Sequence, residues 1–416
     1  MRSDVQLSTR FLTTQNAHQV GLLVTLSGDT PSRRAPINVS LVLDRSGSMS
    51  GGPLTEAKAA ARRFASFLGP DDRLSVVVFD DLVETIFGPA PAGGTAAAEA
   101  IARVDSRGST NLSGGWLKGL EHVKRGLVDG TNRVILLTDG QANQGVTDLG
   151  QLVAMAAAGA TERVSTSCIG FGAHFNEQLL EPMAKEARGN YWFVESEDQM
   201  TGIFESEIEG LVALSAQNVE IEVSLSHPKA AGVTFMQSIP VQTTPNGTWR
   251  VNLGDLYATS PRPLGLVFHV EDVEQLGKVE VAQVKIEADV VTPEGIAHRT
   301  IVMPVVANLD GSDHVEPTVE ETFLRFRTAK AREEAVRLSR RGDFEAAAIH
   351  LEDAALACAP FMASPIVAEE SRDLRAQAQL LKQRTYSEMD MKYDGARAMA
   401  SRDGKLGYLG KMNRNR

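Results

Sequence analysis

The sequence of 416 residues is poor in cysteine and in long apolar runs, and each scarcity excludes a class of protein. Its two cysteines, Cys168 and Cys358, exclude the disulfide-built scaffold of small secreted domains. No stretch approaches the roughly 20 apolar residues that a membrane-spanning helix requires. The N-terminus lacks the apolar core of a secretory signal peptide, so we expect a cytoplasmic protein with no membrane partner.

Positive charge is also in deficit. The chain has 42 Lys and Arg against 53 Asp and Glu, a net charge of −11. Phosphate binding needs a basic surface, so this balance argues against nucleic acid as the main partner. Residues 371–416 are an exception, with eleven Lys or Arg against five Asp or Glu. We interpret this basic end as a solvated helix face followed by a loosely ordered tail rather than an RNA-binding arm.

Two common catalytic motifs are missing. The chain contains no G-x-x-x-x-G-K-[S/T] segment, so an ATPase acting with this protein would have to be a separate chain. None of the eight histidines forms an H-E-x-x-H pattern, which excludes a zincin protease.

Apolar strands and amphipathic helices alternate through the first half of the chain. Residues 37–43 and 133–138 are nearly continuous apolar runs, which are typical of strands covered on both faces. Residues 54–69 place apolar side chains at helical spacing, and a last helix is expected at about 198–214. This alternation predicts an α/β fold with a doubly wound, mostly parallel sheet.

A different pattern follows the α/β segment. Residues 219–225 alternate apolar and polar, and several further strands separated by turns predict a β-sandwich. Residues 20–26 alternate in the same way, although an isolated hairpin near the N-terminus would be only marginally stable. We therefore predict that residues 1–36 pair with the later strands and that the α/β unit is an insertion in one β-domain.

The C-terminal part has the composition of helices. A long amphipathic helix is expected from Pro317 to Arg340, a return helix at 344–357, and a third from Pro365 to about Arg384. The chain is thus predicted to contain N-terminal sandwich strands, an α/β domain, the remaining β-sandwich, a helical hairpin or bundle, and a loosely ordered basic tail. The corresponding ranges are 1–36, 37–214, 215–312, 313–390 and 391–416.

Three short polar segments occur at strand ends and loops of the α/β unit. The first, D-x-S-x-S at 44–48, follows a buried strand; the second, Gly-Ser-Thr-Asn at 108–111, opens a helix; the third, Thr-Asp-Gly at 138–140, ends another buried strand. Open α/β sheets bind ligands at the carboxyl ends of their strands. The segments together offer two carboxylates and three hydroxyls, from Asp44, Ser46, Ser48, Thr110 and Asp139.

These groups are all hard oxygen ligands, which suit Mg²⁺, Mn²⁺ or Ca²⁺ better than zinc or copper. With only two carboxylates and with neutral Ser and Thr ligands, a divalent cation at this site stays electrophilic. A vacant coordination position could therefore accept a carboxylate from another molecule.

The order and content of these segments resemble the von Willebrand factor type A family and its metal-ion-dependent adhesion site, over about residues 37–214. The resemblance implies that Asp44, Ser46 and Ser48 are metal ligands, that Thr110 is another, and that Asp139 ligates directly or through water. It also implies a protein-binding, non-enzymatic function. The layout is similar to that of bacterial members, and of inter-alpha-inhibitor heavy chains, in which a β-domain brackets the type A domain.

We therefore expect a metal-dependent scaffold protein that coordinates an Asp or Glu carboxylate of a protein partner. The alternative is an accessory, co-chaperone-like subunit of an AAA+ ATPase or metal-chelatase machine. A third possibility comes from Gly47-Ser48-Met49-Ser50-Gly51, which matches the nucleophile motif of serine hydrolases. In that case Ser50 would act with an Asp and a His, for which Asp139 and His174 occur in a suitable order.

Overall fold

The computed structural model describes residues 1–12, 16–29, 34–172, 175–196, 199–258, 260–271, 277–292 and 295–404. The chain divides into two compact units. One comprises Met1–Thr30, Ser215–Val290 and Ala297–Arg416, and the other comprises Pro31–Leu214 with Val291–Ile296. In the described part of the chain, no helix combines the length and apolar character needed to cross a membrane.

The second unit is built on a six-stranded sheet in the order β5-β4-β3-β6-β7-β8. Its strands are β3 (Ile37–Asp44), β4 (Arg73–Phe79), β5 (Val83–Pro91), β6 (Thr131–Thr138), β7 (Ser165–Phe171) and β8 (Arg188–Val194). All neighbours are parallel except the edge strand β5, which is antiparallel to β4. Every residue of β3 and β6 is buried, as their apolar sequences predict for central strands.

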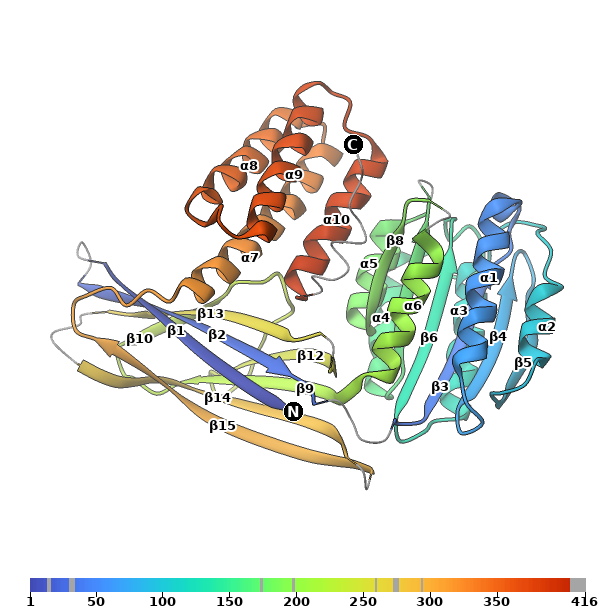
Figure 1. The fold of residues 1–416 in the computed structure, drawn as a ribbon, viewed down its shortest axis with the longest axis horizontal. Coiled ribbons are helices and arrows are strands. Elements are labelled where there is room, and N and C mark those ends of the chain that lie inside the picture. Colours follow the sequence, from blue (N-terminus) through green and yellow to red (C-terminus); the bar gives the residue numbers. More distant parts are fainter. Residues whose placement is uncertain are drawn as a thin grey trace. The chain divides into compact units, whose positions relative to one another are not determined.

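Helices cover both faces of this sheet (Figure 1). They are α1 (Gly52–Phe67), α2 (Ala96–Ala102), α3 (Leu112–Arg125), α4 (Leu149–Thr161), α5 (Glu177–Glu186) and α6 (Met200–Val212). Helices α1 and α6 pack together through an edge-to-face contact between Phe64 and Phe204, whose ring centroids are 6.4 Å apart. The predicted doubly wound α/β fold is confirmed.

The first unit contains a β-sandwich made of two antiparallel sheets. One has the order β1-β2-β13-β10 and the other β11-β12-β9-β14-β15. The strands are β1 (Arg2–Leu12), β2 (Ala17–Ser27), β9 (Leu214–Leu225), β10 (Ala230–Phe235), β11 (Gln242–Thr243), β12 (Trp249–Tyr257), β13 (Arg262–Val270), β14 (Gly277–Thr292) and β15 (Gly295–Leu309). Apolar residues from both sheets, such as Leu22 and Ile286, form one shared core.

The N-terminal strands belong to this sandwich, as the sequence predicted. Strand β2 is paired with β13, with Val20 opposite Phe268 and Val24 opposite Leu264. More than 200 residues separate β2 from β13, and the α/β unit lies between them in the chain. The prediction of a sheet domain inserted between the strands of a β-sandwich is therefore confirmed.

Four helices follow the sandwich: α7 (Pro317–Arg340), α8 (Phe344–Ala357), α9 (Pro365–Lys382) and α10 (Glu388–Arg402), with a short 3₁₀ turn η3 (Ala359–Phe361) after α8. Helix α7 packs on the four-stranded sheet where Gly21 and Gly265 leave room for Phe323 and Phe326. A Cβ at Gly265 would lie 2.9 Å from atoms of both rings, so glycine permits this close approach.

Helix α10 corrects the prediction that residues 391–416 are loosely ordered. The helix continues to Arg402, while residues 405–416 lie outside the described residues. Its start is specified by a capping box, in which Ser387 and Asp390 each accept a hydrogen bond from the backbone N–H of the other. The capping box and the buried contacts of α10 favour a helix over a loose chain.

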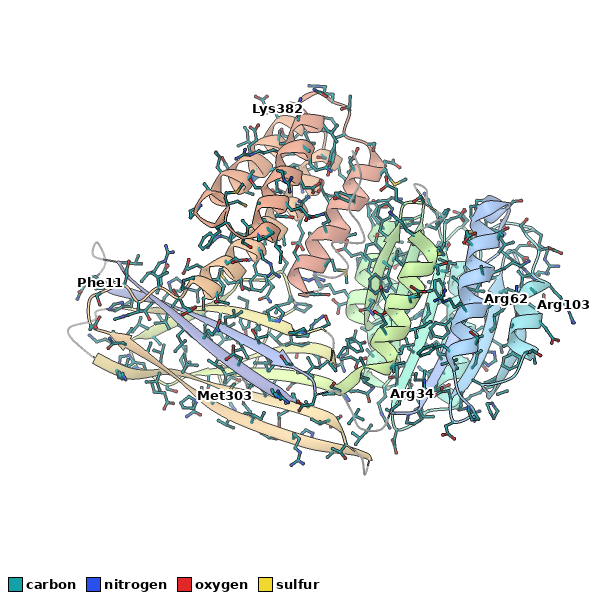
Figure 2. The ribbon with its side chains drawn as sticks, in the orientation of Figure 1. Phe11, Arg34, Arg62, Arg103, Met303 and Lys382 are labelled. Carbon is teal, nitrogen blue, oxygen red and sulfur yellow. The ribbon has the colours of Figure 1, made fainter. Side chains whose placement is uncertain are left out.

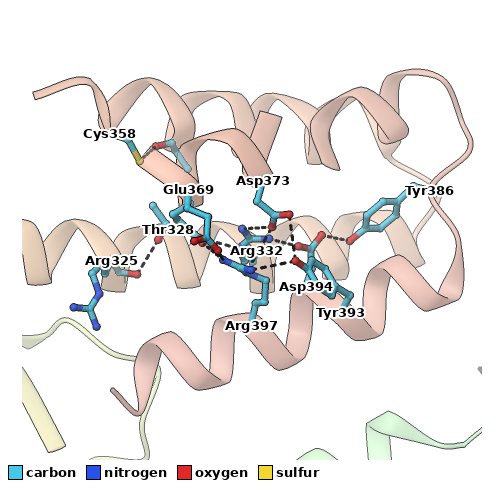
Figure 3. Close-up of polar contacts among 12 residues, drawn as sticks. Arg325, Thr328, Arg332, Cys358, Glu369, Asp373, Tyr386, Tyr393, Asp394 and Arg397 are labelled. Carbon is cyan, nitrogen blue, oxygen red and sulfur yellow. Dashed lines mark hydrogen bonds and ion pairs between the residues drawn. The ribbon is translucent and has the colours of Figure 1, made fainter. Parts of the chain in front are cut away.

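Those buried contacts centre on Arg332 of α7, whose side chain is fully buried (Figure 3). Its Nε donates to Glu370 Oε1 over 2.9 Å and its Nη2 to Asp373 Oδ2 over 2.8 Å, both on α9. Its Nη1 donates to Asp394 of α10. Arg397 of α10 in turn donates to Glu370 Oε2 over 3.0 Å. Because every charge in this network has an oppositely charged partner, it can be buried, and it joins α7, α9 and α10.

Candidate metal centre

The three polar segments meet at the carboxyl ends of β3 and β6, which are neighbours in the sheet. In the order of the sheet, β4 is the neighbour of β3 in one direction, and β6, which comes later in the chain, is its neighbour in the other direction. This is the point where the strand order reverses, the usual position of a ligand site in an open α/β sheet.

The first segment begins with Asp44, the last residue of β3, which is fully buried. The backbone N–H of Ser46 donates to Asp44 Oδ1 over 2.8 Å, which orients the carboxylate within its own loop. A 3₁₀ turn, η1 (Gly47–Met49), then brings Ser48 back toward Ser46, with 3.1 Å between the two hydroxyl oxygens.

The segment after β6 lies against the first one. Thr138 Oγ1 donates to Asp44 Oδ2 over 2.5 Å, and Ser48 Oγ donates to Asp139 Oδ1 over 2.8 Å. The first bond joins the Asp44 carboxylate to the segment at the end of β6. The second joins the Asp139 carboxylate to the loop that follows β3.

Thr110 completes the group. A Cβ atom placed on Gly140 would lie 3.2 Å from Thr110 Oγ1 and 3.7 Å from Asp44 Oδ2. Glycine at position 140 therefore leaves a space beside these two oxygens that any other residue would partly fill. The structure thus brings together all five residues that the sequence singled out.

The Asp44 carboxylate is buried, so a nearby positive charge would stabilise its ionised form. Burial raises the pKa of Asp44 to about 6, and the charge of Asp139 acts in the same direction, whereas hydrogen bonds from Thr138 and Ser46 oppose the shift. Carboxylate and hydroxyl oxygens are donors that Mg²⁺, Mn²⁺ and Ca²⁺ accept. Among the described residues, no three His, Cys, Asp or Glu side chains are grouped to hold a metal ion, so a site here depends on the hydroxyls.

The group has one accessible side. Asp44 and Ser46 are buried, whereas Ser48 and the neighbouring Gly47 are exposed, as are Gly108 and Ser109 of the second segment. This rim lets a group from another molecule approach the oxygens, and the exposed side chains of Asp81 and Arg107 lie beside it at Gly108.

Sequence reasoning missed a cluster beside these loops, which we call the Asp80 cluster (Arg45, Asp80 and Arg107). The Asp80 side chain is fully buried, and its Oδ2 accepts a hydrogen bond from the Nε of Arg45 and from that of Arg107, each over 2.7 Å. Burial by itself would raise the pKa of Asp80, but these donors and the Leu82 N–H lower it. The only signal in the sequence was the acidic pair that follows the strand at 73–79.

Ser50, the nucleophile of the hydrolase alternative, is exposed at the end of η1, and its backbone N–H donates to Gly47 O over 3.2 Å. His174, which that alternative requires, lies outside the described residues. Asp139, the acid of that alternative, accepts a hydrogen bond from Ser48.

Comparisons with known proteins concern the family and the fold of the domain that carries these loops. Residues 38–206 match the family model of the von Willebrand factor type A domain. The chain is 27% identical over 366 residues to the uncharacterised protein sll0103 of Synechocystis sp., which covers 85% of each chain. It is 28% identical over 211 residues to human inter-alpha-trypsin inhibitor heavy chain H1, covering 48% of this chain but only 23% of that protein.

Two solved structures share the fold over nearly the whole chain. A von Willebrand factor type A protein from Catenulispora acidiphila has a TM-score of 0.67 at 18% identity and covers 91% of this chain and 89% of its own. The ArnB paralog VWA2 from Sulfolobus acidocaldarius has a TM-score of 0.61 at 16% identity, and the match covers 96% of this chain and 97% of that protein. Type A domains generally mediate protein–protein interactions in adhesion and scaffolding. The family match and the fold together establish that residues 38–206 of this chain form a von Willebrand factor type A domain.

Proposed function

We propose that this protein is a divalent-metal-dependent, non-enzymatic scaffold of the cytoplasm that binds a protein partner through a metal-ion-dependent adhesion site. Asp44, Ser46, Ser48, Thr110 and Asp139 would hold the cation, either directly or through water. The metal would be Mg²⁺, with Mn²⁺ or Ca²⁺ as substitutes of the same chemistry. The bound cation supplies a Lewis-acidic position for an Asp or Glu carboxylate of the partner.

The observation that carries this proposal is the convergence of the three loops on one space. Ser48 links the first loop to Asp139, and Thr138 links the third loop to Asp44. Gly140 leaves that space open beside Asp44 and Thr110. Three loops that are far apart in the sequence thus present oxygen atoms of the kind a hard cation requires.

The residues of the chain have separate tasks in this proposal. Asp44 and Asp139 provide the negative charge, while the hydroxyls of Ser46, Ser48 and Thr110 provide neutral oxygen ligands. With only two carboxylates, the cation keeps the affinity for an external anion. Contacts from the exposed rim at Gly47, Gly108 and Ser109 would then determine which carboxylate-bearing surface fits.

The test is a pull-down from the lysate of the source organism, with the full chain as bait in four lanes. They are wild type with Mg²⁺, wild type with EDTA, Asp44→Ala with Mg²⁺, and Ser50→Ala with Mg²⁺. Ser50 lies in the same loop and is exposed, so its variant is a matched control. We expect a partner that is retained by wild type and Ser50→Ala in Mg²⁺ and lost in the other two lanes.

The same proteins in all four lanes would contradict the proposal, because binding would then be independent of the metal. The identity of a metal-dependent partner distinguishes the alternatives: an AAA+ ATPase or chelatase subunit would assign the protein an accessory role in that machine. A melting temperature that rises with Mg²⁺ in wild type but not in Asp44→Ala would support the assignment of the metal ligand independently of any partner.

A further inference from the structure

We propose that the Asp80 cluster is a positioning device that keeps the first and second metal loops in register, so that Arg45, Asp80 and Arg107 set the affinity for the cation without touching it. The inference rests on the metal site proposed above. It assigns a role to three residues outside the D-x-S-x-S, Thr and Asp positions of that site.

The two arginines come from the two loops that must be aligned. Arg45 lies between the proposed ligands Asp44 and Ser46, and Arg107 lies three residues before Thr110. Their side chains meet on the same atom, Asp80 Oδ2, over 2.7 Å each. Asp80 directly follows β4, so a rigid strand of the sheet provides the fixed point for both loops.

Backbone hydrogen bonds also join the second loop to the first loop and to Asp80. The N–H of Arg107 donates to Arg45 O over 2.8 Å, and the N–H of Gly47 donates to Gly108 O over 3.1 Å. The N–H of Asn111 donates to Asp80 O over 2.7 Å. Arg107, Gly108 and Asn111 are thus bonded either to the first loop or to Asp80, so a shift of the second loop would disturb both sets of bonds.

The charges of this region indicate a positional role rather than attraction of the cation. Arg45 and Arg107 are matched by Asp80 and by Glu84, whose Oε2 lies 3.0 Å from Arg45 Nη2. The formal charges of these four residues cancel, so the cluster itself has no net charge to attract the cation, while exposed Asp81 acts on Arg107 from outside the cluster. Asp80 is buried, so moving either arginine away would leave a buried carboxylate short of a donor, and this opposes movement of both loops.

The role can be tested by whether removal of Arg107 strengthens or weakens binding of the cation. Arg107 is positively charged, so its removal would strengthen binding of a divalent cation if only the local field mattered. If Arg107 positions Thr110, its removal weakens binding instead. Its side chain is 52% exposed, so replacement by methionine keeps the aliphatic stem without opening the core.

The experiment measures free Mn²⁺ by electron paramagnetic resonance during titration of the full-length chain. The chains compared are wild type, Asp44→Ala, Arg107→Met, Arg107→Lys and Arg103→Met. Arg103, at the end of α2, is also exposed (Figure 2). Its replacement by methionine removes the same charge from the neighbouring segment. Each chain is also melted in EDTA to compare its stability without metal.

We expect Arg107→Met to weaken Mn²⁺ binding about tenfold, the effect typical of losing an outer partner of a metal ligand. Arg107→Lys should recover part of the loss, and Arg103→Met should bind as wild type or slightly better. In EDTA, Arg107→Met should melt somewhat below Arg103→Met, because buried Asp80 loses one donor but keeps Arg45 and the Leu82 N–H. Both chains should still be folded at the temperature of the titration, so a loss of Mn²⁺ binding would not come from unfolding.

Equal or tighter binding by Arg107→Met, with Asp44→Ala still inactive in binding, would overturn the positioning role and leave the metal site intact. If wild type and Asp44→Ala fail alike to bind Mn²⁺, the metal site and the positioning role both fall. A loss in Arg107→Met that is matched by an equal loss in Arg103→Met would also overturn the role, because the loss would then not depend on the bond between Arg107 and Asp80.

Discussion

At the scale of single residues, Gly140 is the most informative position of the candidate metal site. It is not a ligand, and it is not among the glycines with a positive φ, so its backbone does not require glycine. What requires glycine is space, because a Cβ would lie within 3.3 Å of two atoms of the Thr110 side chain. Position 140 therefore tests the site by shape alone, with every proposed ligand kept.

We predict that Gly140→Ala weakens Mn²⁺ binding by about tenfold, since the added methyl group displaces Thr110 relative to Asp44. The measurement is the same Mn²⁺ titration. The matched control is Gly202→Ala on α6, where a Cβ would meet nothing within 4 Å. That control should bind normally and gain slightly in stability, by up to about 1 kcal/mol, because alanine favours a helix. Normal Mn²⁺ affinity in Gly140→Ala would argue against a cation in this space.

At the scale of elements, the last helix of the type A domain is attached to the sheet through one buried carboxylate. Glu207 of α6 and Arg133 of β6 are both fully buried and form an ion pair over 3.0 Å. Ser167 Oγ donates to Glu207 Oε1 over 2.5 Å, and Asn190 Nδ2 and Trp192 Nε1 each donate to its Oε2 over 2.7 Å. Sliding of α6 along the sheet would remove these donors, so the network opposes such a displacement.

We predict that Glu207→Gln destabilises the type A domain by about 3–5 kcal/mol, since it breaks a fully buried ion pair with Arg133. Glu205→Gln on the same helix is the control. Glu205 pairs with Arg63 at the surface, where an ion pair contributes about 0–1 kcal/mol. Urea unfolding followed by tryptophan fluorescence measures both, because Trp116 and Trp192 lie in this domain. Equal midpoints for the two variants would contradict the anchoring role.

The same pair predicts a pH dependence. Burial alone would raise the pKa of Glu207, but Arg133 and the three other donors lower it below the ordinary value of 4.5. A lowered carboxyl pKa stabilises the folded state above the unfolded value and loses this contribution as pH falls toward the folded value. The stability gap between wild type and Glu207→Gln should thus be full at pH 7 and narrow below about pH 4.5. A gap that widens in acid would reverse the sign of this argument.

At the scale of the whole molecule, the chain is a β-sandwich with a second domain inserted after its second strand. Strand β2 lies between β1 and β13 in its sheet, so the sandwich cannot form without residues from both sides of the insertion. The inserted domain, by contrast, contains all six strands of its own sheet and the helices on both faces. The two parts of the chain therefore differ in how much they depend on distant sequence.

We predict that residues 34–214 expressed alone unfold in one cooperative transition and bind Mn²⁺ with an affinity within about threefold of the full chain. The physical reason is that the sheet, its helices and the three metal loops all lie within this range. Thermal unfolding by circular dichroism and the Mn²⁺ titration are the measurements. A fragment without a cooperative transition would show that the sandwich is needed for the type A domain to fold.

The sequence by itself determined the features that depend on local pattern. Apolar runs such as 37–43 predicted buried strands, because a strand covered on both faces must be apolar throughout. Polar residues directly after those strands indicated the candidate site, since parallel strands all end at one edge of the sheet. The N-terminal alternation even indicated a distant pairing, because a lone hairpin does not bury enough surface to be stable.

Only the tertiary structure decided which distant side chains meet. Nothing in the spacing of Arg45, Asp80 and Arg107 indicates that they share one oxygen atom, and the same holds for Glu207 with Arg133. Helix α10 was missed for a related reason, since part of what favours it is the buried contact of Asp394 and Arg397 with α7 and α9. A repeating pattern reports what one element needs to bury, whereas a buried ion pair depends on where two elements end up, and local sequence does not encode that position.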